Sequence, residues 1–242
     1  MDRKAYMRDV YSKYWITARE KRYGVSRYDE LVCNYIHENL PKNQRILEAA
    51  IGTGIPFSDY LQKKGHELYG IDISPALIER CSELNEFIKC SVGDVESIEF
   101  ENNFFDCTIC FHSTWYFPNI YKAIEEMIRV TKASGLIIFD IQNADNCYVN
   151  KAYSRRVFRS KGFGLVIQFG VNVAKFFLQR GALNWRGIVH EVPVHPEDII
   201  TYFKYGVQKI HPIVMTPEFK LEICEDIAKL KNFEKITFVV YK

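Results

Sequence analysis

The sequence has almost no excess of charge of either sign, since its 242 residues carry 32 Lys and Arg against 30 Asp and Glu. A protein held on nucleic acid mainly by charge needs a strongly basic field, so no nucleic-acid partner is expected. Proline and glycine gather in no low-complexity segment, and 48% of the residues are hydrophobic. These features exclude a disordered chain and predict a single domain over residues 1–242.

An apolar run of signal-peptide length is also missing after Met1, which predicts a cytoplasmic protein. The seven cysteines are odd in number and scattered, as expected in a reducing compartment. Cys107 and Cys110 form a C-x-x-C without a second pair, and in a strand these two side chains would face opposite sides. We therefore expect both cysteines in the core and no metal site.

Helical and strand-like segments alternate from about residue 25 to 141, which is typical of βαβ units around a parallel sheet. Strands are predicted over residues 45–49, 67–71, 87–92, 104–111 and 135–140. Helices are predicted over residues 26–40, 55–64 and 118–132, and another begins at Ser74-Pro75. Two further strands are predicted over 208–215 and 235–241, with a helix over 217–231 between them.

Acidic residues are absent between Lys151 and His190, although the rest of the chain carries a net charge of −6. Eight basic residues fall in this interval: Lys151, Arg155, Arg156, Arg159, Lys161, Lys175, Arg180 and Arg186. The interval also breaks the alternation of strands and helices. We expect residues 142–207 to form an insertion that packs over the fold as a lid.

Residues 162–178 hold one charge but are interrupted by Gln168, Asn172 and Lys175, which makes them a poor membrane span. On a helix these polar positions share one side and leave a wide apolar face. A basic insertion with such a face also fits peripheral contact with a membrane surface.

The segment 46–54 runs from an apolar strand that carries Glu48 straight into Gly52-x-Gly54 and a helix. In an open parallel sheet such a turn is where nucleotides bind. A nicotinamide fingerprint would place a third glycine where Phe57 stands, and the charge of Glu48 would repel a pyrophosphate. Asp72 lies twenty residues after Gly52, the spacing at which an acid meets ribose hydroxyls. The turn therefore indicates a ribose-bearing ligand with positive charge and no pyrophosphate.

Four segments taken in order resemble the motifs of class I S-adenosylmethionine-dependent methyltransferases: LEAAIGTG (47–54), YGIDIS (69–74), the acidic stretch 93–106 and TKASGLIIF (131–139). The resemblance covers roughly residues 26–141. It implies an α/β fold with a doubly wound, mostly parallel sheet of seven strands, the last of them antiparallel. It also implies S-adenosylmethionine as cofactor.

The resemblance implies roles for individual residues as well. Around the methionine moiety it places Glu48, Gly52 and Gly54, with Ala50 where the family usually has its first glycine. It places Asp72 on the ribose and Asp94 with Val95 at the adenine. Further cofactor contacts are expected from Ile73, Phe111 and Tyr14. Residues 1–25 are expected to form a helical cover over the cofactor, the alternative being a helix that packs on the sheet edge.

Methyl transfer from a sulfonium is an in-line displacement, so orientation of the acceptor is its main requirement and a general base is optional. The loop after the fourth strand contains His112 and Tyr116, and the insertion contributes His190; these three are the predicted catalytic residues. For His112 a plain hydrogen-bonding role is the alternative.

A small-molecule acceptor methylated at oxygen or nitrogen is expected, because the sequence carries no motif of nucleic-acid methylation and no appended RNA-binding domain. If the cations of the insertion face the pocket, the acceptor is anionic, for example a sugar, lipid or natural-product metabolite; otherwise they form a solvated face. An RNA or protein methyltransferase and a catalytically silent module acting through a partner stay open as alternatives. A monomer or homodimer is expected.

Overall fold

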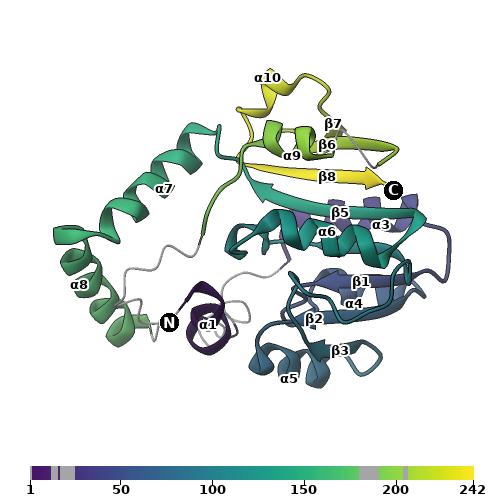
Figure 1. The fold of residues 1–242 in the computed structure, drawn as a ribbon, viewed down its shortest axis with the longest axis horizontal. Coiled ribbons are helices and arrows are strands. Elements are labelled where there is room, and N and C mark those ends of the chain that lie inside the picture. Colours follow the sequence, from purple (N-terminus) through teal and green to yellow (C-terminus); the bar gives the residue numbers. More distant parts are fainter. Residues whose placement is uncertain (1, 12–15, 17–24, 180–190, 204–206) are drawn as a thin grey trace.

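A sheet flanked by helices on both faces is the centre of the fold (Figure 1). Residues 2–11, 16, 25–179, 191–203 and 207–242 are described by the computed structural model. Within these ranges the sheet has eight strands in the order β3-β2-β1-β4-β5-β8-β6-β7. Their bounds are β1 Arg45–Ala49, β2 Glu67–Asp72, β3 Lys89–Val92, β4 Phe105–Cys110, β5 Thr131–Gln142, β6 Lys209–Met215, β7 Leu221–Ile223 and β8 Lys235–Tyr241.

Strands β1 to β5 run parallel, and β8 runs antiparallel between β5 and β6. This confirms the predicted α/β class and the antiparallel last strand. The sheet has eight strands where seven were expected, because the short β7 adds an antiparallel edge beside β6.

Successive strand residues face opposite sides of the sheet, which divides the core into two layers. Leu47 packs in the layer that contains helices α6 (Ile120–Val130) and α9 (Pro196–Tyr202). Ile46 packs in the layer of α3 (Arg27–Asn39), α4 (Phe57–Lys63) and α5 (Pro75–Leu84). The central parallel strands β1 and β4 are therefore buried on both faces, as apolar runs such as FFDCTICF predict, whereas the edge strand β3 is largely exposed.

Two predicted helix starts are confirmed in detail. Ser26 caps α3 by accepting from the Asp29 amide, while the Asp29 side chain accepts from the Ser26 amide, so the capping box is complete. Ser74 caps α5, with Pro75 in the first turn.

The predicted helix over residues 217–231 is wrong. Thr216 and Lys220 close a turn in which Phe219 has a φ of +57°, and β7 follows. Leu221 and Ile223 follow the period of two that a strand requires, and the only helix here is the short α10 (Ile227–Leu230), capped by Asp226.

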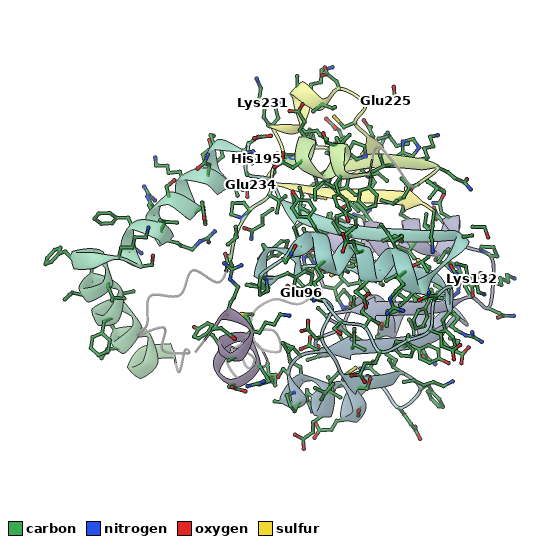
Figure 2. The ribbon with its side chains drawn as sticks, viewed as in Figure 1. Glu96, Lys132, His195, Glu225, Lys231 and Glu234 are labelled. Atoms are coloured by element: carbon green, nitrogen blue, oxygen red, sulfur yellow. The ribbon has the colours of Figure 1, made fainter. Side chains whose placement is uncertain are left out.

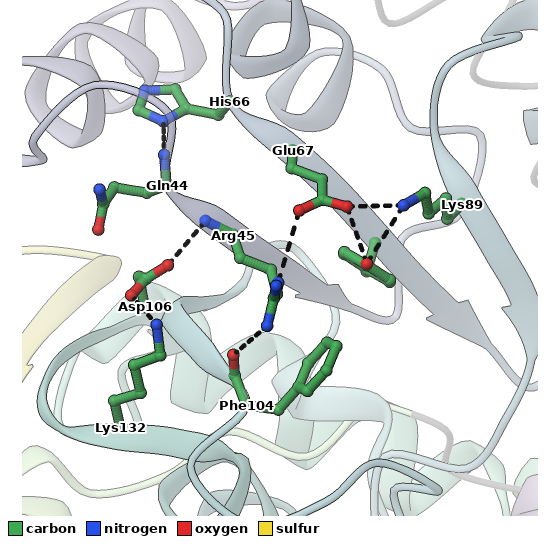
Figure 3. Close-up of polar contacts among 9 residues, drawn as sticks. Gln44, Arg45, His66, Glu67, Lys89, Phe104, Asp106 and Lys132 are labelled. Atoms are coloured by element: carbon green, nitrogen blue, oxygen red, sulfur yellow. Dashed lines mark hydrogen bonds and ion pairs between the residues drawn. The ribbon is translucent and has the colours of Figure 1, made fainter.

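The amino ends of the parallel strands are tied together by polar contacts (Figure 3). The Asp106 carboxylate accepts from the Arg45 amide at 2.9 Å and pairs with the Lys132 ammonium. The Glu67 carboxylate pairs with Lys89 at 2.6 Å and with the Arg45 guanidinium at 3.5 Å. These contacts join the amino ends of β1, β2, β3, β4 and β5. The opposite, carboxyl ends of these strands are where a ligand would bind in such a sheet.

Within the described residues, further helical segments lie beyond this sheet and its covering helices. Near the amino terminus are α1 (Arg3–Tyr6) and the π-helical turn η1 (Met7–Tyr11). The predicted insertion forms α7 (Cys147–Arg159) and α8 (Gly162–Gln179), called here the arm. No residue of α7 is buried, and the arm extends away from the sheet rather than over it (Figure 1). The covering role expected of a lid is therefore not seen in α7 and α8, whereas α9, from the end of the same insertion, packs on the sheet through the buried Ile199.

Candidate functional site

The turn after β1 has an unusual backbone, in which Ala50, Gly52 and Gly54 have φ angles of +60°, +58° and +75°. A side chain is disfavoured in this left-handed region, which explains why a glycine is usual at position 50 in the family that the sequence resembles. A Cβ at Gly54 would lie 3.1 Å from both Asn85 Nδ2 and Cys81 Sγ, so this glycine is needed for packing. A Cβ at Gly52 would meet nothing within 4 Å, so Gly52 faces open space.

That open space belongs to a cleft at the carboxyl ends of the strands. The cleft encloses about 980 Å³, including its solvent-open mouth. Predicted site residues form much of its wall: Glu48, Ala50, Gly52, Asp72, Ile73, Asp94, Val95, Phe111, His112 and Tyr116. Gly54 does not line the cleft, because it packs against Asn85 and Cys81 on the other side of the turn. Tyr14 and His190 lie outside the described residues.

Asp72 ends β2 and joins it to the β1 turn. Its Oδ2 accepts from the Gly52 amide at 3.0 Å and its Oδ1 from the Ser74 amide at 2.9 Å. Burial raises the pKa of Asp72 to about 6, against the opposing effect of these two amide donors. A carboxylate in this position suits ligand hydroxyls that supply further donors.

Glu48 is buried at the end of β1, where its Oε2 accepts from the Ser58 amide at 3.1 Å and from the Ser58 hydroxyl at 2.5 Å. These bonds fix the orientation of the carboxyl group beside the cleft. A carboxylate at this point favours a cationic ligand and opposes a phosphate.

Sequence reasoning missed Lys4, which brings α1 to the cleft. Its ammonium lies 2.6 Å from Asp94 Oδ2 and 2.7 Å from Glu96 Oε2, and Lys4 and Met7 both line the cleft. Figure 2 shows Glu96 on the side of the sheet nearest α1. No local pattern could have revealed this contact, because it joins residues about ninety positions apart.

His112 is the centre of a polar cluster at the edge of the cleft. Its Nε2 lies 2.6 Å from Asp29 Oδ1, its Nδ1 lies 2.6 Å from Lys235 Nζ, and its amide donates to Asp140 Oδ1 at 2.8 Å. Burial alone would raise the pKa of Asp29, but the bond and charge of His112 and the bonds to Ser26 lower it to about 2. Asp29, Lys235 and Asp140 are functional candidates that the sequence analysis did not single out.

Both ring nitrogens of His112 are engaged. The Asp29 carboxylate accepts a hydrogen bond from Nε2, while Nδ1 lies between Lys235 Nζ at 2.6 Å and Asp140 Oδ2 at 3.4 Å. The backbone of His112 has a φ of +59°, a conformation that costs a non-glycine residue free energy and is found at functional sites.

Aromatic rings form the remaining wall beside His112. Phe57 and Phe111 stack with ring centroids 4.4 Å apart, and Phe57 is also 5.6 Å from the His112 ring. Phe57 thus fills with a buried ring the place where a dinucleotide fingerprint needs a glycine.

The residues present fit S-adenosylmethionine. Glu48 supplies an oriented carboxylate, Asp72 an acceptor for ribose hydroxyls, and Gly52 the space for a close backbone approach.

Residues 47–139 match the family model described as a methyltransferase domain. The Bacillus subtilis methyltransferase YqeM is 28% identical over 134 residues, which are 49% of this chain and 54% of that protein. The demethylmenaquinone methyltransferase of Renibacterium salmoninarum is 28% identical over 131 residues, 54% of each protein. The chain thus spans about half the length of the curated relatives it matches.

Among solved structures, a TehB-like SAM-dependent methyltransferase from Corynebacterium glutamicum is similar with a TM-score of 0.59. Its sequence is 15% identical, and the likeness covers 96% of both chains. The family match agrees with a methyltransferase domain, and the likeness to this structure shows the predicted fold.

Ala50→Gly and Gly52→Ala should change stability in opposite directions. The first removes a left-handed Ala and should raise the free energy of unfolding by about 0.5–1 kcal/mol, and the second should lower it by about 1 kcal/mol. Chemical denaturation measures both. Gly170→Ala is the matched control, because its Cβ also meets open space but its backbone is helical. It should not destabilise the protein. Equal losses for Gly52→Ala and Gly170→Ala would contradict the backbone explanation.

Proposed function

We propose that this chain, whose residues 47–139 form a class I S-adenosylmethionine-dependent methyltransferase domain, transfers a methyl group to an oxygen or nitrogen of a small-molecule acceptor. The observation that carries the proposal is the cleft, which brings Glu48, Asp72 and His112 around one space. The first two suit the donor, and the third stands where an acceptor would be oriented.

The donor is held by the residues that already form a hydrogen-bonded frame. Asp72 receives the ribose hydroxyls, and the carboxylate of Glu48 faces the cationic end. Asp94 and Val95 hold the adenine, with Lys4 fixing the carboxylate of Asp94 from the side. Bound there, the donor supplies an electrophilic methyl group for in-line displacement.

His112 orients the acceptor and takes its proton. Asp29 holds the ring in the tautomer whose basic nitrogen is Nδ1, and a base oriented by a carboxylate is a common catalytic arrangement. Lys235 occupies Nδ1 in this structure, and it has Asp140 Oδ2 at 3.3 Å and the rings of Tyr28 and Trp115 as other partners. An acceptor hydroxyl that replaces Lys235 at Nδ1 presents its proton to the ring. Tyr116, from the same loop, contributes to the acceptor wall.

The acceptor need not be anionic. Among the described basic residues between Lys151 and His190, none lines the cleft. Arg156 instead pairs with Glu191 at 2.6 Å. The cleft wall is mainly apolar, with Phe57 and Phe111 near His112. The named substrate of the Renibacterium relative, demethylmenaquinone, supports an apolar small-molecule acceptor of this kind.

Donor binding should depend on pH through Asp72. Its pKa is raised to about 6, so the carboxyl is ionised above pH 6 and protonated below it. The ionised form accepts hydroxyl bonds more strongly, so the Kd for S-adenosylmethionine should rise by up to tenfold per pH unit as pH falls below 6. Calorimetric titration between pH 5 and 8 measures this.

Asp72→Asn should weaken donor binding tenfold or more at pH 7.5 and flatten the dependence on pH. Asp198→Asn, an exposed change on α9, should leave both unchanged. A Kd for Asp72→Asn equal to that of the wild type would overturn the ribose assignment.

The raised pKa of Asp72 also affects folding stability. The native state holds this proton more tightly than the unfolded chain, so the free energy of unfolding should fall as pH rises from about 4 to 6 and Asp72 ionises.

His112→Asn should lower kcat by about 10²–10⁴ and leave the donor Kd within twofold. Asn tolerates a positive φ, so the backbone of the loop is preserved. Formation of S-adenosylhomocysteine against a panel of quinol, phenol, carboxylate and amine acceptors measures the effect. His211→Asn, on β6 outside the cleft wall, is the matched control.

The role of a base is separated from a merely structural role by comparing the effects on kcat and on donor binding. Both His112→Asn and Asp29→Asn should lower kcat, Asp29→Asn by less because it keeps the imidazole, and both should leave the donor Kd within twofold. A structural role for the ring would instead weaken donor binding together with kcat. If the kcat of His112→Asn equals that of the wild type, His112 is not the general base.

A further inference from the structure

The arm presents an unusual surface. In α7 no residue is buried, and the described part of α8 also leaves large apolar side chains exposed. Figure 1 shows both helices standing apart from the sheet. Helices of a globular domain normally turn an apolar face toward the core, so the outward faces of this pair call for another partner.

The outward face of α7 combines aromatic rings with cations. At 100° per residue, Tyr148, Lys151, Arg155, Phe158 and Arg159 fall within about 100° of one another. All five are exposed, Tyr148 by 72% and Phe158 by 67%. None of the three cations forms an ion pair with a described residue.

The outward face of α8 is apolar. Phe163, Val166 and Ile167 are exposed by 77%, 65% and 42%, and they too fall within about 100° on the helix. Gly170 and Ala174 continue this exposed face. A solvent-facing helix of an isolated protein would carry charges at such positions.

The charge of the segment decides among the partners that could cover these faces. Residues 151–190 carry eight cations and no acid. If two copies of the chain packed through their arms, the positive charges of the two arms would repel one another, which opposes self-association. Nucleic acid would satisfy the cations but leave the exposed Phe and Val side chains in water. An anionic lipid surface satisfies both.

We propose that the arm binds the surface of an anionic lipid bilayer, with the rings of Phe158 and Phe163 inserted at the level of the headgroups and the cations of α7 against lipid phosphates. Aromatic and basic residues combined on one face are characteristic of helices that lie in the interface plane. Among the described helices, none combines the length and hydropathy needed to cross a bilayer. The inference goes beyond methyl transfer and does not depend on it.

Sedimentation with vesicles tests the proposal. The full chain is mixed at low salt with vesicles of phosphatidylcholine alone or of phosphatidylcholine containing 30% phosphatidylglycerol, roughly the anionic content that gives a strong surface potential. Binding to the anionic vesicles is expected to be at least tenfold stronger, and to weaken as salt is raised.

Two sets of variants separate the contributions of the arm. Phe163→Ser with Val166→Ser should weaken binding to anionic vesicles at least tenfold, and Phe87→Ser, an equally exposed ring outside the arm, should leave it within twofold. Replacing Lys151, Arg155 and Arg159 by Gln should weaken binding about a hundredfold at low salt. Gln at Lys42, Lys64 and Lys220 is the matched charge control, since these exposed lysines lie outside the arm.

Measuring S-adenosylmethionine binding by calorimetry distinguishes a failure of the membrane proposal from a failure of the proposed methyltransferase function. All these variants should bind S-adenosylmethionine as the wild type does, because none of the substituted residues lines the cleft. The inference fails if the chain binds neither kind of vesicle, or if the arm variants bind as tightly as their controls. Concentration-dependent dimerisation that Phe163→Ser abolishes, without vesicle binding, would show that a second copy covers the arm instead.

Discussion

The hydrogen bond from the Gly52 amide to Asp72 ties the turn after β1 to the end of β2, beside the backbone bond from the Ile51 amide to Ile71. The Ser74 amide donates to the same carboxylate, just before the cap of α5. The carboxylate therefore fixes the backbone of both strands before any ligand arrives. Because the turn reverses through residues with positive φ, it leaves the space beside Gly52 open to the cleft.

A second junction, around His112, joins parts of the chain that the turn does not reach. The ring contacts Asp29 of α3 and Lys235 of β8, and the backbone contacts Asp140 of β5. Asp29 also completes the cap of α3, so one carboxylate serves the helix and the imidazole together. The orientation of His112 thus depends on the packing of three separate elements.

Local patterns predicted the parts of the fold that are set by neighbours in sequence. The bounds of β1, the Ser26 cap and the glycine turn after β1 belong to this group, because propensity, capping and turn geometry act over a few residues. The contacts of Lys4 with Asp94 and of Lys235 with His112 depend on tertiary packing across 90 and 123 positions. The helix predicted over 217–231 was wrong because the alternation of Leu221 and Ile223 and the turn at Phe219 outweighed its helical residues.

The position of β8 has a consequence for how the protein is made. This strand lies inside the sheet, between β5 and β6, although it follows β5 by about ninety residues in the sequence. During synthesis the edge of β5 is exposed until β8 emerges, and an open strand edge is a template for pairing with other chains. The nascent protein thus passes through a stage in which strands β1 to β5 and their cleft residues have been made, but β5 still lacks its partner β8. Early contacts of β1, β2 and β4 with their helices would protect it during that interval.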